Sequence, residues 1–183
     1  MMKVVFILFL TLGVAAAAAC SSADAPAPNP DDSCFVAYAP NFNGFQSWSS
    51  YTYDAGTQGA PTSFVVSHVS GVRTEYINEL PPAGATEFPV GTMIVKEIAA
   101  NDPTNHQTFA MVKRGCDYNA AGAKNWEWME LVDALPGATI LWRGAQPPPG
   151  EMYAADGAAC NTCHTGCNDN DSVCSPMIRL AAH

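Results

Sequence analysis

Fourteen prolines and fourteen glycines divide this 183-residue chain into short segments. Between these breaks, Val, Ile, Thr, Phe and Trp alternate with polar residues, a pattern that favours β-strands over long helices. Helix is plausible only at residues 131–135 and after His164. We therefore expect a mainly β domain, an antiparallel sheet of the α+β class with few short helices. The expected strands are residues 63–69, 71–78, 92–99, 107–114, 126–132 and 139–143.

The N-terminus has the three parts of an export signal: a Lys3 charge, an apolar run over residues 4–14 and small residues up to Ala19. The run is too short to be read as a membrane span. Ala17-Ala18-Ala19-Cys20 resembles the lipobox of bacterial lipoproteins, although the same alanines also suit ordinary signal cleavage. We therefore predict a signal peptide at residues 1–19 and a disordered tether at 20–33, with Cys20 a candidate for lipidation. The protein is expected to be exported, either periplasmic or anchored to the outer membrane of a bacterium.

Residues 34–183 amount to one domain. The formal net charge of -9 and the pI near 4.6 argue against nucleic acid as a partner, because phosphate binding needs clustered Lys and Arg. The acidity itself indicates no particular partner.

Cys160-Asn161-Thr162-Cys163-His164 matches the C-x-x-C-H motif of c-type cytochromes. In that motif two thiols add to the vinyl groups of haem, and the following imidazole ligates the iron. The sequence thus predicts one covalent haem c, attached at Cys160 and Cys163, with His164 as the proximal iron ligand. Two alternatives are a cluster that only forms disulfides, and a zinc or iron-sulfur site built from Cys160, Cys163, Cys167 and Cys174.

If haem takes Cys160 and Cys163, four cysteines remain besides Cys20. An even number in an oxidising compartment predicts two disulfides. Cys167 with Cys174 is the local pair, and Cys34 with Cys116 would tie the N-terminal end of the domain to the sheet, although sequence alone permits three pairings.

The motif stands near the C-terminus, with nineteen residues after His164. Small electron-transfer cytochromes carry the motif early and need more chain after it. Four-helix cytochromes carry it late, but their long helices are incompatible with the Pro, Gly and β-branched pattern. The haem is therefore expected at the end of a finished β domain.

Three stretches between residues 73 and 164 resemble the cytochrome P-460 family, which carries C-x-x-C-H at the end of a mainly β domain. They are Arg73-Thr74-Glu75-Tyr76-Ile77, Gly91-Thr92-Met93-Ile94-Val95-Lys96-Glu97-Ile98 and Lys124-Asn125-Trp126. The resemblance implies that Lys96 stands where family members that oxidise hydroxylamine bond a lysine to a meso carbon of the haem. It also implies that the protein is a homodimer. Cys34, Cys116, Cys167 and Cys174 are not part of the family pattern.

Strand alternation places Lys96 on one face with Thr92, Ile94 and Ile98, and Glu97 on the other. Burial against haem would favour loss of the amine's proton, which gives the nucleophilic form. The alternative is a lysine whose ammonium group is exposed to solvent.

The open face of the iron is expected to be capped by distal residues. Arg73, Phe64, Phe88 and Phe109 are candidates for this pocket, although an aromatic residue in a strand also serves as simple core. His68 and His106 are candidate sixth ligands, with solvated histidines as the alternative.

The resemblance implies oxidation of hydroxylamine, or a similar small nitrogen species, with electrons passed to a redox partner cytochrome. One alternative is a nitric-oxide-binding protein similar to cytochrome c-prime-beta, with an open haem and no turnover. Another is plain electron transfer, which would require a sixth ligand.

Overall fold

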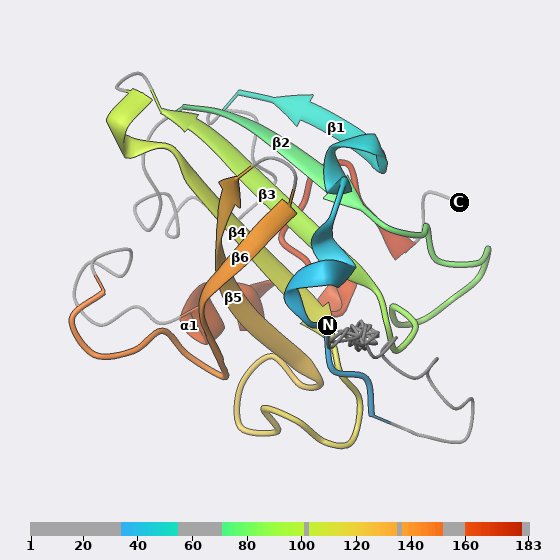
Figure 1. Cartoon of the computed structure of the whole chain (residues 1–183). Helices are drawn as coiled ribbons and strands as arrows, with labels where there is room; N and C mark the ends of the chain where they lie inside the picture. The colour runs from blue at the N-terminus through green and yellow to red at the C-terminus, as the bar shows by residue number, and fades with distance from the viewer. Residues whose placement is uncertain (1–33, 55–70, 101–102, 135–136, 152–159, 181–183) are drawn as a thin grey trace, which may run out of the picture.

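The computed structural model describes residues 34–54, 71–100, 103–134, 137–151 and 160–180. Six strands form one antiparallel sheet in which sequence order and spatial order agree (Figure 1). The strands are β1 Ser49–Tyr53, β2 Gly71–Ile77, β3 Met93–Ala100, β4 Gln107–Lys113, β5 Trp126–Ala134 and β6 Gly137–Gly144. The helical elements are the 3₁₀-helices η1 Ala39–Phe42, η2 Phe45–Ser47, η5 Pro103–Asn105 and η7 Thr165–Asn170, and the α-helix α1 Cys160–His164.

The mainly β antiparallel prediction is confirmed, and β2 to β6 lie where strands were expected. β1 was missed, because Ser49–Tyr53 is a polar edge strand with most side chains outside the core. The helix expected at 131–135 is wrong. β5 continues to Ala134, which pairs with Gly137 of β6, so backbone pairing within the sheet decides the conformation of residues 131–134. The strand expected at 63–69 lies outside the described residues.

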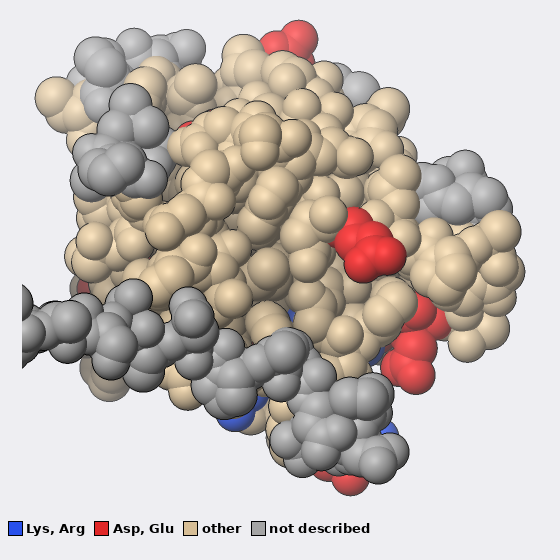
Figure 2. Space-filling view, turned by 45° about the vertical axis from the view of Figure 1, so that its right-hand side comes forward, with Lys and Arg blue, Asp and Glu red and all other residues tan. Residues whose placement is uncertain are grey.

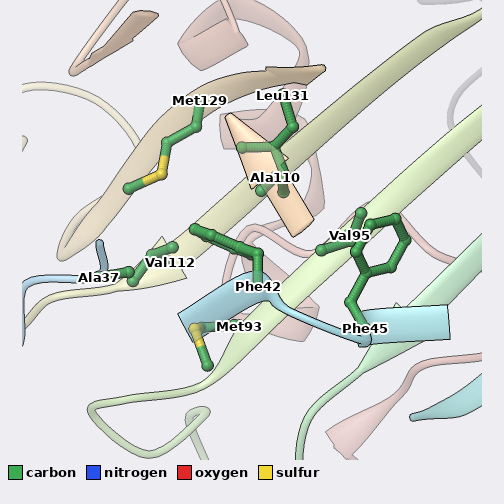
Figure 3. Close-up of a cluster of buried hydrophobic side chains, with 10 residues drawn as sticks. Ala37, Phe42, Phe45, Met93, Val95, Ala110, Val112, Met129 and Leu131 are labelled. Carbon is green, nitrogen blue, oxygen red and sulfur yellow. The ribbon is translucent and has the colours of Figure 1, made fainter. Parts of the chain in front are cut away.

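Side-chain alternation along the strands gives the sheet two different faces. The N-terminal face is the one covered by η1 and η2, where Phe42 and Phe45 pack onto strand residues such as Val95 and Val112 (Figure 3). The buried apolar cluster on this face consists of Ala37, Phe42, Phe45, Met93, Val95, Ala110, Val112, Met129, Leu131 and Ala138.

The C-terminal face is the opposite one, covered by α1 and residues 165–180 (Figure 1). Val173, Ile178 and Leu180 bury apolar surface here against the sheet. Their partners are Ile77, Ile94, Met111, Trp126 and Trp128, with Phe88 and Ala123 from the loops. The alternation expected for β3 is confirmed, since Ile94 belongs to this cluster and Met93 and Val95 to the other.

Both expected disulfides are present. Cys34 bonds Cys116, with their Cα atoms 5.3 Å apart, and Cys167 bonds Cys174, with a Cα separation of 5.4 Å. The first also joins the chain ahead of η1 to the turn after β4, where Cys34 forms a β-bridge with Gly115. Among the described residues, no helix has both the length and the apolar character needed to cross a membrane.

Charged groups occur both on the surface and in the interior. Figure 2 shows one face on which a few carboxylates stand among mainly uncharged residues, with little blue. Part of the positive charge is inside, since Arg73 and Lys113 are buried.

Candidate functional site

The C-x-x-C-H motif forms α1, a single helical turn that lies against the C-terminal face. Cys160 and Cys163 are three residues apart and therefore share one side of the turn. Neither belongs to a disulfide. Cys160 packs beside the apolar cluster, and burial raises the pKa of its thiol to about 11. The structure therefore holds Cys160 and Cys163 as two neighbouring thiols. The alternative in which the cluster forms only disulfides gives no reason for such a pair of thiols.

The side chain of Asn161 fixes α1 to the rest of the domain. Its Oδ1 accepts hydrogen bonds from Asn119 Nδ2 at 2.7 Å, Trp128 Nε1 at 3.0 Å and the Ala123 backbone N–H at 3.1 Å. Its Nδ2 donates to Asn119 Oδ1 at 2.9 Å and to the Ala145 carbonyl at 3.1 Å. A residue between the two cysteines therefore sets the position of the whole motif.

His164 is held in an orientation that suits a metal ligand. Its Nδ1 lies 2.8 Å from the carbonyl oxygen of Ser172, which can only accept, so Nδ1 carries the proton and Nε2 keeps its lone pair. The ring also packs on the indole of Trp128, with 4.4 Å between centroids. Burial, followed by the charge of Lys96, lowers the pKa of His164 to about 4. The imidazole is therefore neutral at pH 7, as metal ligation requires.

Lys96 lies in the middle of β3 and shares the electrostatic environment of α1. Burial lowers the pKa of its amine and Arg73 adds to the lowering, while Glu75 opposes it, as do the more weakly acting Cys160 and Cys163. The register places Glu75 directly beside Lys96 on β2. The structure therefore brings the predicted lysine and both predicted attachment cysteines to the same face of the sheet.

Arg73 and Glu75 lie side by side on that face but differ in how they are bonded. The Glu75 carboxylate accepts hydrogen bonds from Tyr53 Oη at 2.6 Å and from Ser175 Oγ. Arg73 is only 4% exposed, and in the part of the chain that the structure describes, its Nε and Nη1 have no hydrogen-bond partner. Buried donors of this kind suit an anionic group such as a haem propionate. The residues present therefore fit a haem.

The distal candidates fall into different places. Phe109 is buried on β4 directly beside Lys96, so it can line the same space. Phe88 packs in the apolar cluster against Trp126, with 5.9 Å between ring centroids, as a core residue does. His106 is exposed just ahead of β4. Phe64, His68 and Cys20 lie outside the described residues.

The zinc or iron-sulfur alternative loses two of its four thiolates, because Cys167 and Cys174 are bonded to each other. Within the described ranges, no group of three or more His, Cys, Asp and Glu side chains is arranged to hold a metal ion.

Four residues of this site were not found from the sequence: Glu75, Trp128, Asn161 and Ser172. Glu75 could have been found, since it lies two residues after Arg73 in a strand and therefore on the same face. The other three act through tertiary contacts, for which the sequence has no local signal.

No protein-family model, curated protein or solved structure matches this chain. The resemblance to the cytochrome P-460 family therefore rests on the three stretches quoted above.

Proposed function

We propose that this chain is an exported mono-haem c-type cytochrome that oxidises hydroxylamine, or a similar small nitrogen species, at an open haem iron site. The observation that carries this proposal is the shared face of Lys96, His164, Cys160 and Cys163. A motif alone predicts attachment of a haem, whereas a partly buried lysine on the same face as the motif also supports the chemistry of the resembled family.

The chain's own residues would hold the haem as follows. Cys160 and Cys163 attach it covalently through their thiols, and His164 offers Nε2 because Nδ1–H is donated to Ser172. Arg73 offers two buried N–H donors, at Nε and Nη1, to a propionate carboxylate of the haem. When bound, haem supplies an iron with an open coordination position and accepts the electrons of hydroxylamine oxidation. A redox partner cytochrome is then required to receive those electrons.

Lys96 decides between the two leading functions. Burial favours its uncharged amine, which is the nucleophile required for a bond to the macrocycle. Glu75 favours the ammonium form, in which the lysine would stay unmodified. This second influence supports the nitric-oxide-binding alternative, with an open haem and no turnover. Plain electron transfer has less support, since the candidate sixth ligand His106 is exposed. The other candidate, His68, lies outside the described residues.

The test is expression of the chain together with a haem-maturation system. We expect haem stain on a denaturing gel, an intact mass increased by one haem, and a strongly red-shifted Soret band in the reduced protein. A tryptic haem peptide should join the Lys96 segment to Cys160 and Cys163. Removal of the haem by acid-acetone would refute covalent attachment.

Two lysine variants sharpen this experiment. Lys96→Ala should return an ordinary c-type spectrum and lose hydroxylamine oxidation while still binding nitric oxide. The matched control is Lys124→Ala, whose side chain is 63% exposed and pairs with Asp117, and which should change neither property. An ordinary spectrum in the wild type would favour the gas-binding function instead. Retained turnover in Lys96→Ala would show that the open haem suffices.

The N-terminal predictions are part of the same proposal. A chain exported through residues 1–19 and lipidated at Cys20 would anchor the haem domain to a bacterial membrane through residues 20–33. Mass spectrometry of the mature N-terminus tests this, because Cys20→Ala should lose the lipid mass. Sedimentation of the haem-loaded protein tests the proposed homodimer.

A further inference from the structure

The residues that follow α1 form a small ring, because a disulfide joins Cys167 to Cys174. The C-x-x-C-H motif does not require this ring. It contains Ser172, whose carbonyl oxygen accepts the hydrogen bond from His164 Nδ1 at 2.8 Å. We call residues 167–174 the disulfide loop. Its backbone is therefore part of the environment of the proposed iron ligand.

The direction of the Ser172 carbonyl depends on an uncommon backbone conformation. Asp171 and Ser172 are consecutive non-glycine residues with φ of 50° and 66°, in the left-handed region. L-residues with a Cβ adopt this region at a cost in free energy, and two in succession persist only where the surroundings hold them. The conformation of the loop is therefore imposed by its contacts.

Several contacts hold Asp171 and Ser172 in place. The Asp171 carboxylate accepts from Lys113 Nζ at 2.7 and 2.6 Å and from the Phe88 backbone N–H at 2.9 Å. The Asp171 carbonyl accepts from Trp126 Nε1 at 2.7 Å. Inside the loop, the Ser172 N–H donates to the Cys167 carbonyl at 2.9 Å. The sheet thus holds one side of the loop and the disulfide closes the other.

We propose that the disulfide loop is a positioning element for His164. In this proposal, the disulfide keeps the Ser172 carbonyl oxygen hydrogen-bonded to His164 Nδ1–H. A hydrogen bond at Nδ1 fixes the tautomer and makes Nε2 a stronger donor to a metal. A stronger donor stabilises ferric over ferrous iron and lowers the midpoint potential. The consequence for the iron rests on the proposed function, whereas the tautomer of His164 does not.

The main experiment compares two disulfide removals in the full chain. Cys167→Ala with Cys174→Ala opens the loop, and Cys34→Ala with Cys116→Ala is the matched control, since that bond belongs to neither α1 nor the loop. In the haem-loaded proteins we expect the loop variant to have a more positive midpoint potential and a lower iron–histidine stretching frequency. The control should keep both wild-type values. Wild-type values in a folded loop variant would overturn the proposal.

A second readout does not need haem. Nitrogen-15 NMR of the haem-free wild-type chain should show His164 protonated at Nδ1, and the loop variant should shift it toward the Nε2-protonated form common in water. If no haem attaches, the proposed function fails while this measurement still tests the positioning. An unchanged tautomer in the loop variant would refute it.

Should the loop variant not fold, Asp171→Asn replaces it. Asn tolerates the left-handed backbone but loses the ion pair with Lys113. We expect a smaller shift in the same direction, both in the tautomer and in the midpoint potential. No shift in either would count against the disulfide loop as a positioning element.

Discussion

The two faces of the sheet are closed in different ways. On the N-terminal face, Phe42 and Phe45 pack onto strand side chains, and the buried cluster there is entirely apolar. On the C-terminal face, the covering segment is also fixed by polar groups, with buried Glu75 and Lys113 and partly buried Asn161 and Asp171 each bonded across it. Apolar packing has no preferred direction, whereas hydrogen bonds fix orientation. On the C-terminal face, the directed contacts reach α1 itself, through Asn161 and His164.

The N-terminal face has one ionic cluster, at the side of the apolar packing. The Arg143 guanidinium donates to both carboxylate oxygens of Glu127, at 2.8 and 2.5 Å, and to the Ala37 carbonyl at 2.7 Å. Its hydrogen bonds to Glu127 raise the pKa of Arg143. This cluster ties the segment ahead of η1 to β5 and β6 and involves none of the motif residues.

The largest effect is expected from the apolar face. Phe42→Ala removes a fully buried ring and should lower the free energy of unfolding by about 4 kcal/mol, as large-to-small core substitutions do. Chemical denaturation measures it. The spectrum of the remaining folded, haem-loaded protein should be unchanged, since Phe42 contacts the other side of the sheet. Tyr38→Ala, at a side chain that is 55% exposed, is the control and should change little.

A smaller loss is expected when the ion pair beneath the disulfide loop is broken. Lys113→Met leaves Asp171 without its partner and should cost about 3 kcal/mol, at the low end for a buried pair because the Asp171 side chain is 15% exposed. The double variant with Asp171→Asn removes the uncompensated charge as well. Its unfolding free energy should exceed that of Lys113→Met alone, and strict additivity of the two single effects would contradict the coupling.

Asn161→Ala should lower the free energy of unfolding by less than Lys113→Met does, but it should reduce the amount of haem attached per chain. Loss of the amide leaves Trp128 Nε1 and the Ala123 N–H without their acceptor, at a cost of about 2 kcal/mol. Haem yield per chain, measured as pyridine haemochrome, should fall because α1 is no longer fixed. Gly122→Ala tests the same contact independently, since its new Cβ would lie 2.2 Å from Asn161 Nδ2. Normal haem yield in both variants would show that α1 does not need this anchor.

The smallest effect is expected at Glu75. Tyr53→Phe removes one hydrogen bond to the buried carboxylate and should cost about 1.5 kcal/mol, while the Ser175 hydroxyl still donates to it. Thermal or chemical denaturation measures this. A loss as large as that of Phe42→Ala would mean that Glu75 depends on Tyr53 far more than two donors suggest.

The strands that form the core were predictable because their alternation is strong. β3 begins Met-Ile-Val, and its alternation is confirmed because Met93 and Val95 lie in one cluster and Ile94 in the other. β1 was not predictable in this way, because Ser-Ser-Tyr-Thr-Tyr has no apolar alternation and is a strand only by its pairing with β2. The helix expected at residues 131–135 was wrong for a related reason, since pairing with β6 decides the conformation of residues 131–134.

The candidate site could be proposed from the sequence where a short motif suggests the chemistry, as at Cys160, Cys163 and His164, and these assignments stay predictions. Lys96 came from a resemblance, and alternation then gave its face correctly. The polar supports were not predictable, because their partners are far apart in sequence. Lys113 and Asp171 are 58 residues apart, and the group that meets His164 is a backbone carbonyl, which every residue possesses.

The consecutive order of the strands also sets an order in time. Each strand pairs with the one made just before it, so the sheet can form by local steps as the chain emerges from its N-terminal end. α1 and the disulfide loop come later, and until they dock, Ile94, Met111 and Trp128 are left uncovered by Val173, Ile178 and Leu180. The C-terminal face can therefore close only after the residues that follow β6 are available. A chain that ended after β6 would expose this apolar surface to solvent. We therefore expect such a chain to aggregate more readily than the full-length protein.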